Sequence, residues 1–124
     1  MRIICCDDDA EVGKQMECYL QEYFEKYNLA QPEYEYFGSG EELLRDERDA
    51  DIAFLDVEMP EINGIYVGTE LKQRKPNIII FIVIYYRQTV RIIIVIAVIS
   101  DYWRTERFFT VLLCRLGYKV IPFP

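Results

Sequence analysis

The chain has 124 residues and a formal net charge of −7 at pH 7, which is the size of one domain built around a single hydrophobic core. Its acidity argues against direct nucleic-acid binding by this domain. The sequence contains no histidine, which excludes histidine-based catalysis and histidine metal sites.

The cysteines do not form a recognisable metal site or disulfide framework. The four cysteines are Cys5, Cys6, Cys18 and Cys114. Their spacing is not that of metal ligands, and no secretory signal precedes them. We therefore expect four reduced packing residues in a cytoplasmic protein.

Two apolar runs raise the question of a membrane span. Residues 78–84 and 92–99 are each much shorter than the roughly 20 residues that a bilayer requires. Arg87 and Arg91 lie between them, and charged side chains are costly inside a membrane. We expect no transmembrane helix.

The first elements of the chain alternate between strand and helix. Arg2–Cys6 is a short apolar run that predicts a buried strand. Apolar side chains at spacings of three and four predict an amphipathic helix over Ala10–Tyr27, with Asp9 as its N-cap. A more polar strand around Tyr34–Phe37 follows, and its alternation indicates the edge of a sheet.

The alternation continues to residue 84. Ser39 and Glu42 have the spacing of a capping box, which predicts the start of a short helix ending near Asp46. The elements expected next are a buried central strand over Asp51–Asp56, a helix over Ile65–Lys75 stopped by Pro76, and a buried strand over Asn77–Ile84.

Strands that alternate with helices predict an α/β domain with a parallel sheet covered on both faces. The carboxyl ends of parallel strands lie along one edge, so Asp7 and Asp8 should converge with Asp56. If Asp56 stood alone, it would most simply mark the end of its strand. The second acidic cluster, Asp7-Asp8-Asp9, follows the first strand at an equivalent place and favours a functional site instead. Three adjacent carboxylates repel one another unless a divalent cation such as Mg²⁺ is bound. One of them could then attack a phosphoryl group as a nucleophile.

Two segments carry a family resemblance: Ile4-Cys5-Cys6-Asp7-Asp8-Asp9 and Phe54-Leu55-Asp56-Val57-Glu58-Met59-Pro60-Glu61-Ile62-Asn63-Gly64. They resemble the receiver domain of two-component response regulators, closest to receivers with LytTR-type output domains, and the match runs from Met1 to about Ile82. The resemblance implies that Asp56 is the phosphoacceptor. It also implies that Asp7, Asp8, Asp56 and the backbone carbonyl of Glu58 hold Mg²⁺.

The same resemblance implies a doubly wound, five-stranded parallel sheet with the flavodoxin-like order 2-1-3-4-5, in three layers. It implies one receiver domain over residues 1–124, in which 1–84 follow the family and 85–124 diverge. The phosphodonor would be a phosphohistidine on a sensor histidine kinase. The domain would accept a phosphoryl group and could release it by autodephosphorylation, but it would not be a turnover enzyme. The alternative is a pseudo-receiver that acts as a non-enzymatic interaction module.

No output domain follows in this sequence, so we expect either a stand-alone receiver or a fragment whose DNA-binding output domain is missing. The family's switch positions are only partly retained. Val83 stands where a Ser or Thr hydroxyl is expected, and Tyr102 fits the switch aromatic. The lysine position falls on Thr105, or on Arg104 if one residue is missing.

Composition changes at the same point. Residues 1–76 contain 19 acidic and 8 basic side chains, whereas residues 77–124 contain 2 and 6. A fourth helix is expected over Arg87–Ala97, yet its β-branched residues favour a strand. Three explanations stay open: a helix packed in a dimer interface, a strand that pairs or swaps with a neighbour, and a frame change in the gene or clone.

A regular apolar pattern over Thr105–Leu116 predicts a further helix, which argues against a random tail. Residues 92–99 offer more apolar surface than one helix face can bury. We therefore expect a homodimer through residues 87–102 that forms without phosphate.

Overall fold

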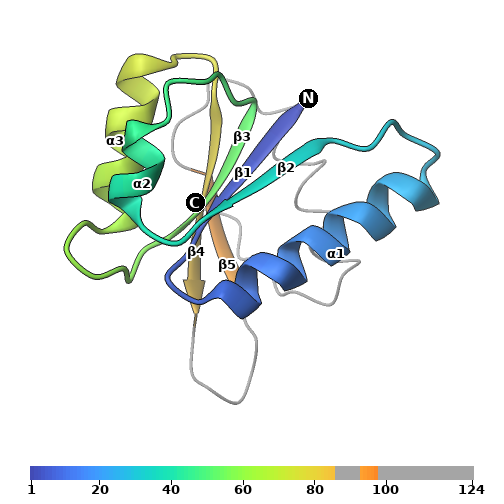
Figure 1. Ribbon diagram of the computed structural model, residues 1–124, viewed down its shortest axis with the longest axis horizontal. Coiled ribbons are helices and arrows are strands. Elements are labelled where there is room, and N and C mark those ends of the chain that lie inside the picture. Colours follow the sequence, from blue (N-terminus) through green and yellow to red (C-terminus); the bar gives the residue numbers. More distant parts are fainter. Residues whose placement is uncertain (86–92, 98–124) are drawn as a thin grey trace.

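The structure, a computed structural model, describes residues 1–85 and 93–97, with side chains described for residues 1–83 (Figure 1). The strands are β1 (Arg2–Cys6), β2 (Glu33–Phe37), β3 (Ile52–Asp56), β4 (Ile79–Tyr85) and β5 (Ile93–Ala97). The helices are α1 (Ala10–Lys26), α2 (Gly40–Arg45) and α3 (Gly64–Arg74). Up to residue 85, every element predicted from the sequence is present, with bounds that differ by a few residues at most.

The strands form one sheet in the order β2-β1-β3-β4-β5. Strands β2, β1, β3 and β4 are parallel, which confirms the α/β architecture and the order 2-1-3-4. Among the described strands β2 pairs with β1 alone, so it is an edge strand of this sheet, as its polar alternation predicted.

The fifth strand corrects the prediction of an all-parallel sheet, because β5 runs antiparallel to β4 with Val83 opposite Val95. Only residues 86–92 connect the two strands, whereas a parallel crossover needs about a dozen residues or more. The helix expected over Arg87–Ala97 is therefore wrong for residues 93–97, which form a strand that pairs within the chain. The predicted helix over Thr105–Leu116 lies outside the described residues.

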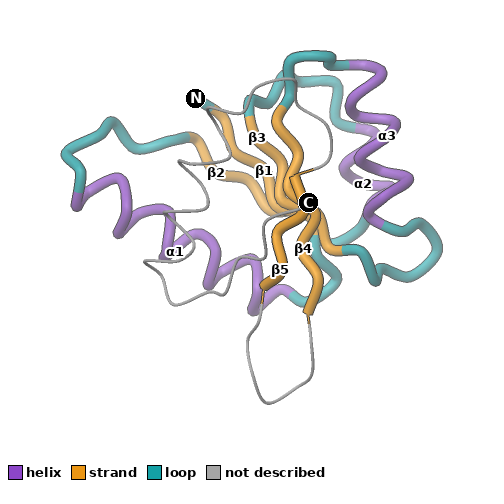
Figure 2. The backbone as a smooth tube through the Cα atoms, turned by 180° about the vertical axis from the view of Figure 1, so that it is seen from behind, coloured by secondary structure: helices purple, strands orange, loops and turns teal. Residues whose placement is uncertain are grey.

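Helices cover both faces of the sheet (Figure 2). α1 lies on one face, where its apolar side packs against alternate residues of the strands, and α2 and α3 lie on the other. Cys5 and Cys6 are buried on opposite faces, as packing residues should be. Cys18 is exposed, so the expectation of a packing role is wrong for it, since it lies on the outer side of α1.

Side-chain caps fix where the helices begin. Asp9 Oδ1 accepts the Glu11 N–H at 3.0 Å, and Ser39 Oγ accepts the Glu42 N–H at 3.2 Å, as predicted. Asn63 caps α3 by accepting the Tyr66 N–H at 2.9 Å, so this helix begins one residue earlier than the sequence indicated. None of the helices within the described ranges has the length and apolar character needed to cross a bilayer.

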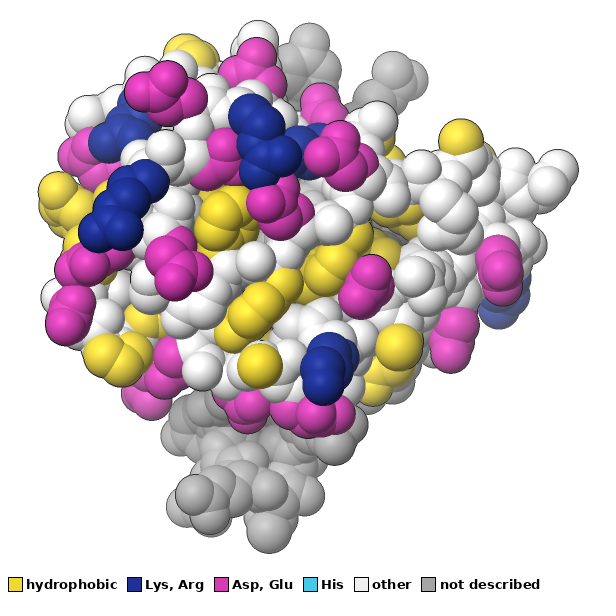
Figure 3. Space-filling model, viewed as in Figure 1, with side chains coloured by type: hydrophobic (Ala, Val, Ile, Leu, Met, Phe, Trp, Pro, Cys, Tyr) yellow, Lys and Arg dark blue, Asp and Glu magenta, His cyan; other side chains and the backbone are white. Residues whose placement is uncertain are grey.

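An ionic network lies where β1 begins, at the sheet edge opposite the acidic cluster. Arg2 is only 8% exposed, and its Nη2 donates to Glu35 Oε2 and Asp46 Oδ2, both at 2.5 Å. Arg48, which is exposed, donates to the same two carboxylates. Hydrogen bonds from the two arginines lower the pKa of Glu35. Acidic and basic side chains lie close together on this part of the surface (Figure 3).

Candidate functional site

The carboxyl ends of β1 and β3 bring three aspartates together. Cys6 lies opposite Leu55 in the parallel register, so the next residues, Asp7 and Asp56, leave the sheet side by side. Carboxylate oxygens of Asp7, Asp8 and Asp56 lie within 4.8 Å of one another. Asp7 and Asp56 are 3% and 5% exposed, whereas Asp8 faces solvent. The structure thus brings together the three carboxylates that the sequence predicted would converge.

Hydrogen bonds fix the backbone around Asp7. Its N–H donates to the Phe37 carbonyl at 3.2 Å, and its own carbonyl accepts the Tyr36 hydroxyl at 2.5 Å. The Asp9 N–H donates to Asp7 Oδ1 at 2.8 Å. Tyr36 therefore supports the site from the edge strand, a role that its place in a polar alternation did not reveal.

Asp56 is held in an unfavourable environment for a charged carboxylate. Burial, together with the negative charges of Asp7 and Asp8, raises the pKa of Asp56 to about 7. The Glu58 N–H, which donates to Asp56 Oδ1 at 3.3 Å, opposes this rise. Two buried carboxylates and one exposed carboxylate at this spacing fit a divalent cation, because a cation would remove their mutual repulsion.

The segment after Asp56 folds back on itself before α3 begins. The Val57 N–H donates to the Val83 carbonyl at 3.3 Å, and the Val57 carbonyl accepts the N–H groups of Met59 and Gly64 at 3.2 Å each. Glu61 adopts a left-handed conformation with φ of 67°, which tightens the turn. The first turn of α3 consequently lies directly against Asp56.

Gly64 permits this close approach. A Cβ at this position would lie 2.0 Å from the backbone oxygen of Asp56, which no real contact allows. We expect Gly64→Ala to lower the free energy of unfolding by about 2 kcal/mol and to displace Asp56, because backbone atoms must move. Urea denaturation of the purified variant measures the loss.

Gly68, one turn further along α3, supplies a matched control. A Cβ there would meet Leu55 and Ile80 side chains at 3.4 and 3.5 Å, which are ordinary contact distances. Gly68→Ala should therefore keep or raise stability, since alanine favours the helix. Equal losses in the two variants would contradict the role given to Gly64.

The structure describes some of the other residues that were predicted to take part in the site or in switching, but not all of them. Val83 is buried and lies opposite Asp56 in the sheet register, next to the acidic cluster but without a hydroxyl. Glu58 is adjacent to Asp56 through its backbone N–H. Tyr102, Arg104 and Thr105 lie outside the described residues.

One contact near the site had no sequence signal beyond strand alternation. The Cys6 thiol donates to the thioether sulfur of Met59 at 3.5 Å. Burial raises the pKa of Cys6 to about 12, so the sulfur keeps its proton at neutral pH. The alternation of β1 places Cys6 on the face opposite Cys5, but it does not reveal which loop residue Cys6 meets.

Comparison with known proteins agrees with this architecture. Solved structures similar to the chain include the response regulator TrrA of Thermotoga maritima in complex with Mg²⁺-BeF, with a TM-score of 0.62, 22% identity, and coverage of 90% of this chain and 98% of that one. A CheY-like receiver domain protein of Methanospirillum hungatei JF-1 has a TM-score of 0.59 and 16% identity, with coverage of 96% and 77%. At these identities the likeness shows the fold.

The regulator DrrB of Thermotoga maritima, an OmpR/PhoB homologue, has a TM-score of 0.59 and 19% identity over 99% of this chain. The match covers 45% of the DrrB chain, so the present chain spans less than half of that protein. No curated protein matches the chain. The family model described as response regulator receiver domain matches residues 3–102. The chain therefore belongs to the response regulator receiver domain family, the phosphoacceptors of two-component signal transduction systems.

Proposed function

We propose that Asp56 is the residue that accepts the phosphoryl group. The observation that carries this proposal is the convergence of Asp7 and Asp8 on Asp56, with Asp56 buried at the end of β3. A carboxylate oxygen of Asp56 attacks the phosphorus atom, and the bond from phosphorus to the imidazole nitrogen of a phosphohistidine donor breaks. The imidazole leaves and takes up a proton, so one acyl phosphate forms for each phosphohistidine consumed.

Asp7, Asp8 and Asp56, together with the backbone carbonyl of Glu58, are the proposed ligands of Mg²⁺. When bound, Mg²⁺ neutralises charge on the transferring phosphoryl oxygens. The chain's own contribution is to bury Asp56 at the end of β3 and to align it beside Asp7 and Asp8. The support is the spacing of the three carboxylates and the Glu58 N–H bond to Asp56. The domain then accepts a phosphoryl group and can release it by autodephosphorylation, without acting as a turnover enzyme.

Incubation with acetyl phosphate and Mg²⁺ should add one phosphoryl group to the intact chain, as read by mass spectrometry. Asp56→Asn should abolish the adduct, because an amide oxygen is a poor nucleophile. Asp9→Asn is the matched control, since asparagine also caps a helix and Asp9 lies outside the carboxylate cluster.

The outcomes separate the two candidate functions. Labelling of Asp56→Asn at the wild-type yield would place the chemistry at another residue. A folded wild-type chain that accepts no phosphoryl group would instead favour the pseudo-receiver, which signals by binding alone.

The proposed partner is a sensor histidine kinase, and the proposed setting is the cytoplasm. The free thiols of Cys5, Cys6 and Cys18 support a reducing compartment. We infer that residues 1–124 form one receiver domain that does not bind DNA directly, and that any DNA-binding output domain of LytTR type is separate from it. The acidic balance of the chain is the reason that DNA contact is assigned to that output domain.

We further propose a homodimer through residues 87–102 that forms without phosphate. Val83 cannot donate a hydrogen bond to a phosphoryl group. The loss of one charge-assisted hydrogen bond is worth about 1.5–3 kcal/mol, so phosphorylation should shift the conformational equilibrium only weakly.

Light scattering after size-exclusion chromatography should show a dimer with and without beryllofluoride. A monomer that dimerises only with beryllofluoride would contradict this prediction, and Val83→Thr tests whether a hydroxyl restores the response.

A further inference from the structure

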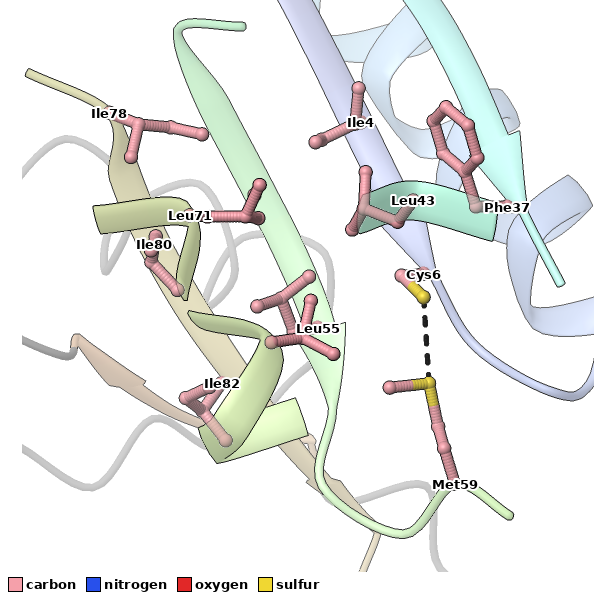
Figure 4. Packing of buried hydrophobic residues seen from close by; sticks show 12 residues of the cluster. Ile4, Cys6, Phe37, Leu43, Leu55, Met59, Leu71, Ile78, Ile80 and Ile82 are labelled. Carbon is pink, nitrogen blue, oxygen red and sulfur yellow. Dashed lines mark hydrogen bonds between the residues drawn. The ribbon is translucent and has the colours of Figure 1, made fainter. Parts of the chain in front are cut away.

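A pair of buried sulfur atoms lies directly beneath the loop that follows Asp56. Cys6 is 0% exposed and Met59 is 8% exposed. Their sulfurs are 3.5 Å apart, with the thiol of Cys6 as the donor (Figure 4). In this view Met59 extends from the loop after β3 toward the end of β1, where Cys6 lies.

The backbone of the loop from Val57 to Gly64 is anchored at its ends, and within the loop the Met59 N–H donates to the Val57 carbonyl and the Ile62 N–H to the Pro60 carbonyl. Val57 bonds to the Val83 carbonyl at the start, and Gly64 bonds back to the Val57 carbonyl at the end. Between them, the side chain of Met59 is buried in the cluster that contains Cys6, Phe37 and Leu43, and the partly buried side chain of Ile62 packs against the same cluster. Met59 is therefore the most deeply buried contact between the middle of the loop and the core, and the polar partner of its sulfur is Cys6.

We propose that Cys6 is a positioning residue for the cation site: its thiol holds Met59, and Met59 holds the backbone of Glu58 next to Asp56. This proposal rests on the proposed function, because it takes the Glu58 carbonyl as a Mg²⁺ ligand. Glu58 immediately precedes Met59, and its N–H already contacts Asp56 Oδ1 at 3.3 Å. Because Glu58 and Met59 are adjacent in the chain, we expect a change in the packing of Met59 to alter the position of Glu58 beside the carboxylate cluster.

The chemistry of the pair explains why a thiol suits this place. Methionine is a flexible side chain with a soft sulfur, so packing alone defines its conformation poorly. A weak S–H donor adds direction to the contact without bringing a strongly polar group into an apolar cluster. Groups that orient the ligands of a metal site commonly change metal affinity by 10–100-fold when they are removed.

Cys5 provides the matched control, because it is the neighbouring cysteine, is equally buried, and lies on the opposite face of the sheet. The test compares Cys6→Ala, Met59→Leu, the double variant and Cys5→Ala. Isothermal titration with Mg²⁺ gives the dissociation constant, and amide hydrogen exchange in the metal-free protein gives the opening rate at Glu58 and Met59. Thermal unfolding of each variant reports the loss of packing separately.

Cys6→Ala should weaken Mg²⁺ binding about tenfold and speed exchange at Glu58 and Met59, whereas Cys5→Ala should lower thermal stability without either change. Met59→Leu keeps the volume and removes the acceptor, so it should resemble Cys6→Ala, and the double variant should lose no more than either single variant. If Cys6→Ala does not fold, Met59→Leu alone provides the test. Cys6→Ser, which retains a donor, should recover part of the affinity.

Wild-type affinity and wild-type loop exchange in both Cys6→Ala and Met59→Leu would overturn the proposal and leave Cys6 as a packing residue. A wild-type chain that binds no Mg²⁺ would instead contradict the proposed function. The exchange rates of the metal-free proteins would still decide whether Cys6 holds the loop.

Discussion

Replacing Arg2 by methionine should lower the free energy of unfolding by about 3 kcal/mol, which is typical when one partner of a buried ion pair is removed. The guanidinium of Arg2 is almost fully buried and donates to Glu35, to Asp46 and to the carbonyls of Arg48 and Asp49. Methionine fills much of the same volume but leaves Asp46, whose side chain is 10% exposed, without its nearest cation. Urea denaturation at neutral pH measures the difference.

Arg48→Ala is the matched control, because Arg48 contacts the same two carboxylates from the surface. Solvent screens an exposed ion pair, so this variant should lose clearly less stability than Arg2→Met. Equal losses would show that burial of Arg2 does not determine the strength of the network. Combining Arg2→Met with Asp46→Leu should recover part of the loss, since the isolated charge is then removed as well.

The network should also give the protein a defined acid sensitivity. Burial opposes the shift, but hydrogen bonds from Arg48 and Arg2 keep the pKa of Asp46 below its usual value, and the pKa of Glu35 is lowered for the same reason. These carboxylates contribute stability above their ordinary pKa values. That contribution is lost as the pH falls through their lower folded-state pKa values.

Local patterns in the sequence were sufficient to predict the first four strands, the three helices and the acidic site. Asp9 and Ser39 mark helix starts through contacts two or three residues away, and Asp7 and Asp56 follow apolar runs whose ends a parallel sheet must align. The network of Arg2 could not be predicted in this way. Its partners Glu35 and Asp46 are 33 and 44 residues away and carry no local pattern.

The course of the chain after β4 was mispredicted for a different reason. The family resemblance implied a crossover helix, but the β-branched run at residues 93–97 and its short connection to β4 both favour a hairpin. Local propensity was the better guide there. The contact of Cys6 with Met59 likewise depends on how the loop after Asp56 folds back, which neither residue's immediate neighbours determine.

In the absence of divalent cations, Asp56→Asn should be more stable than the wild-type protein at pH 8. The folded wild-type chain holds a proton on Asp56 up to about pH 7, whereas the unfolded chain releases it near the ordinary value of 3.8. The stability contributed by that proton is fully present below pH 3.8 and is lost as the pH rises through 7. Each pH unit between these values is worth about 1.4 kcal/mol, so the loss amounts to roughly 4 kcal/mol.

The asparagine variant carries no charge at this position, so it should lack this part of the pH dependence. Its advantage over the wild-type protein in EDTA should grow from pH 5 to pH 8, as measured by urea denaturation. Saturating Mg²⁺ should then stabilise the wild-type protein more than the variant, because a ligand that binds only the folded state adds stability by mass action. If Asp56→Asn were less stable than the wild-type protein in EDTA at pH 8, burial and repulsion from Asp7 and Asp8 would not together disfavour the charged form of Asp56. The case for a divalent cation there would then lose its physical basis, because the cation is inferred from that repulsion.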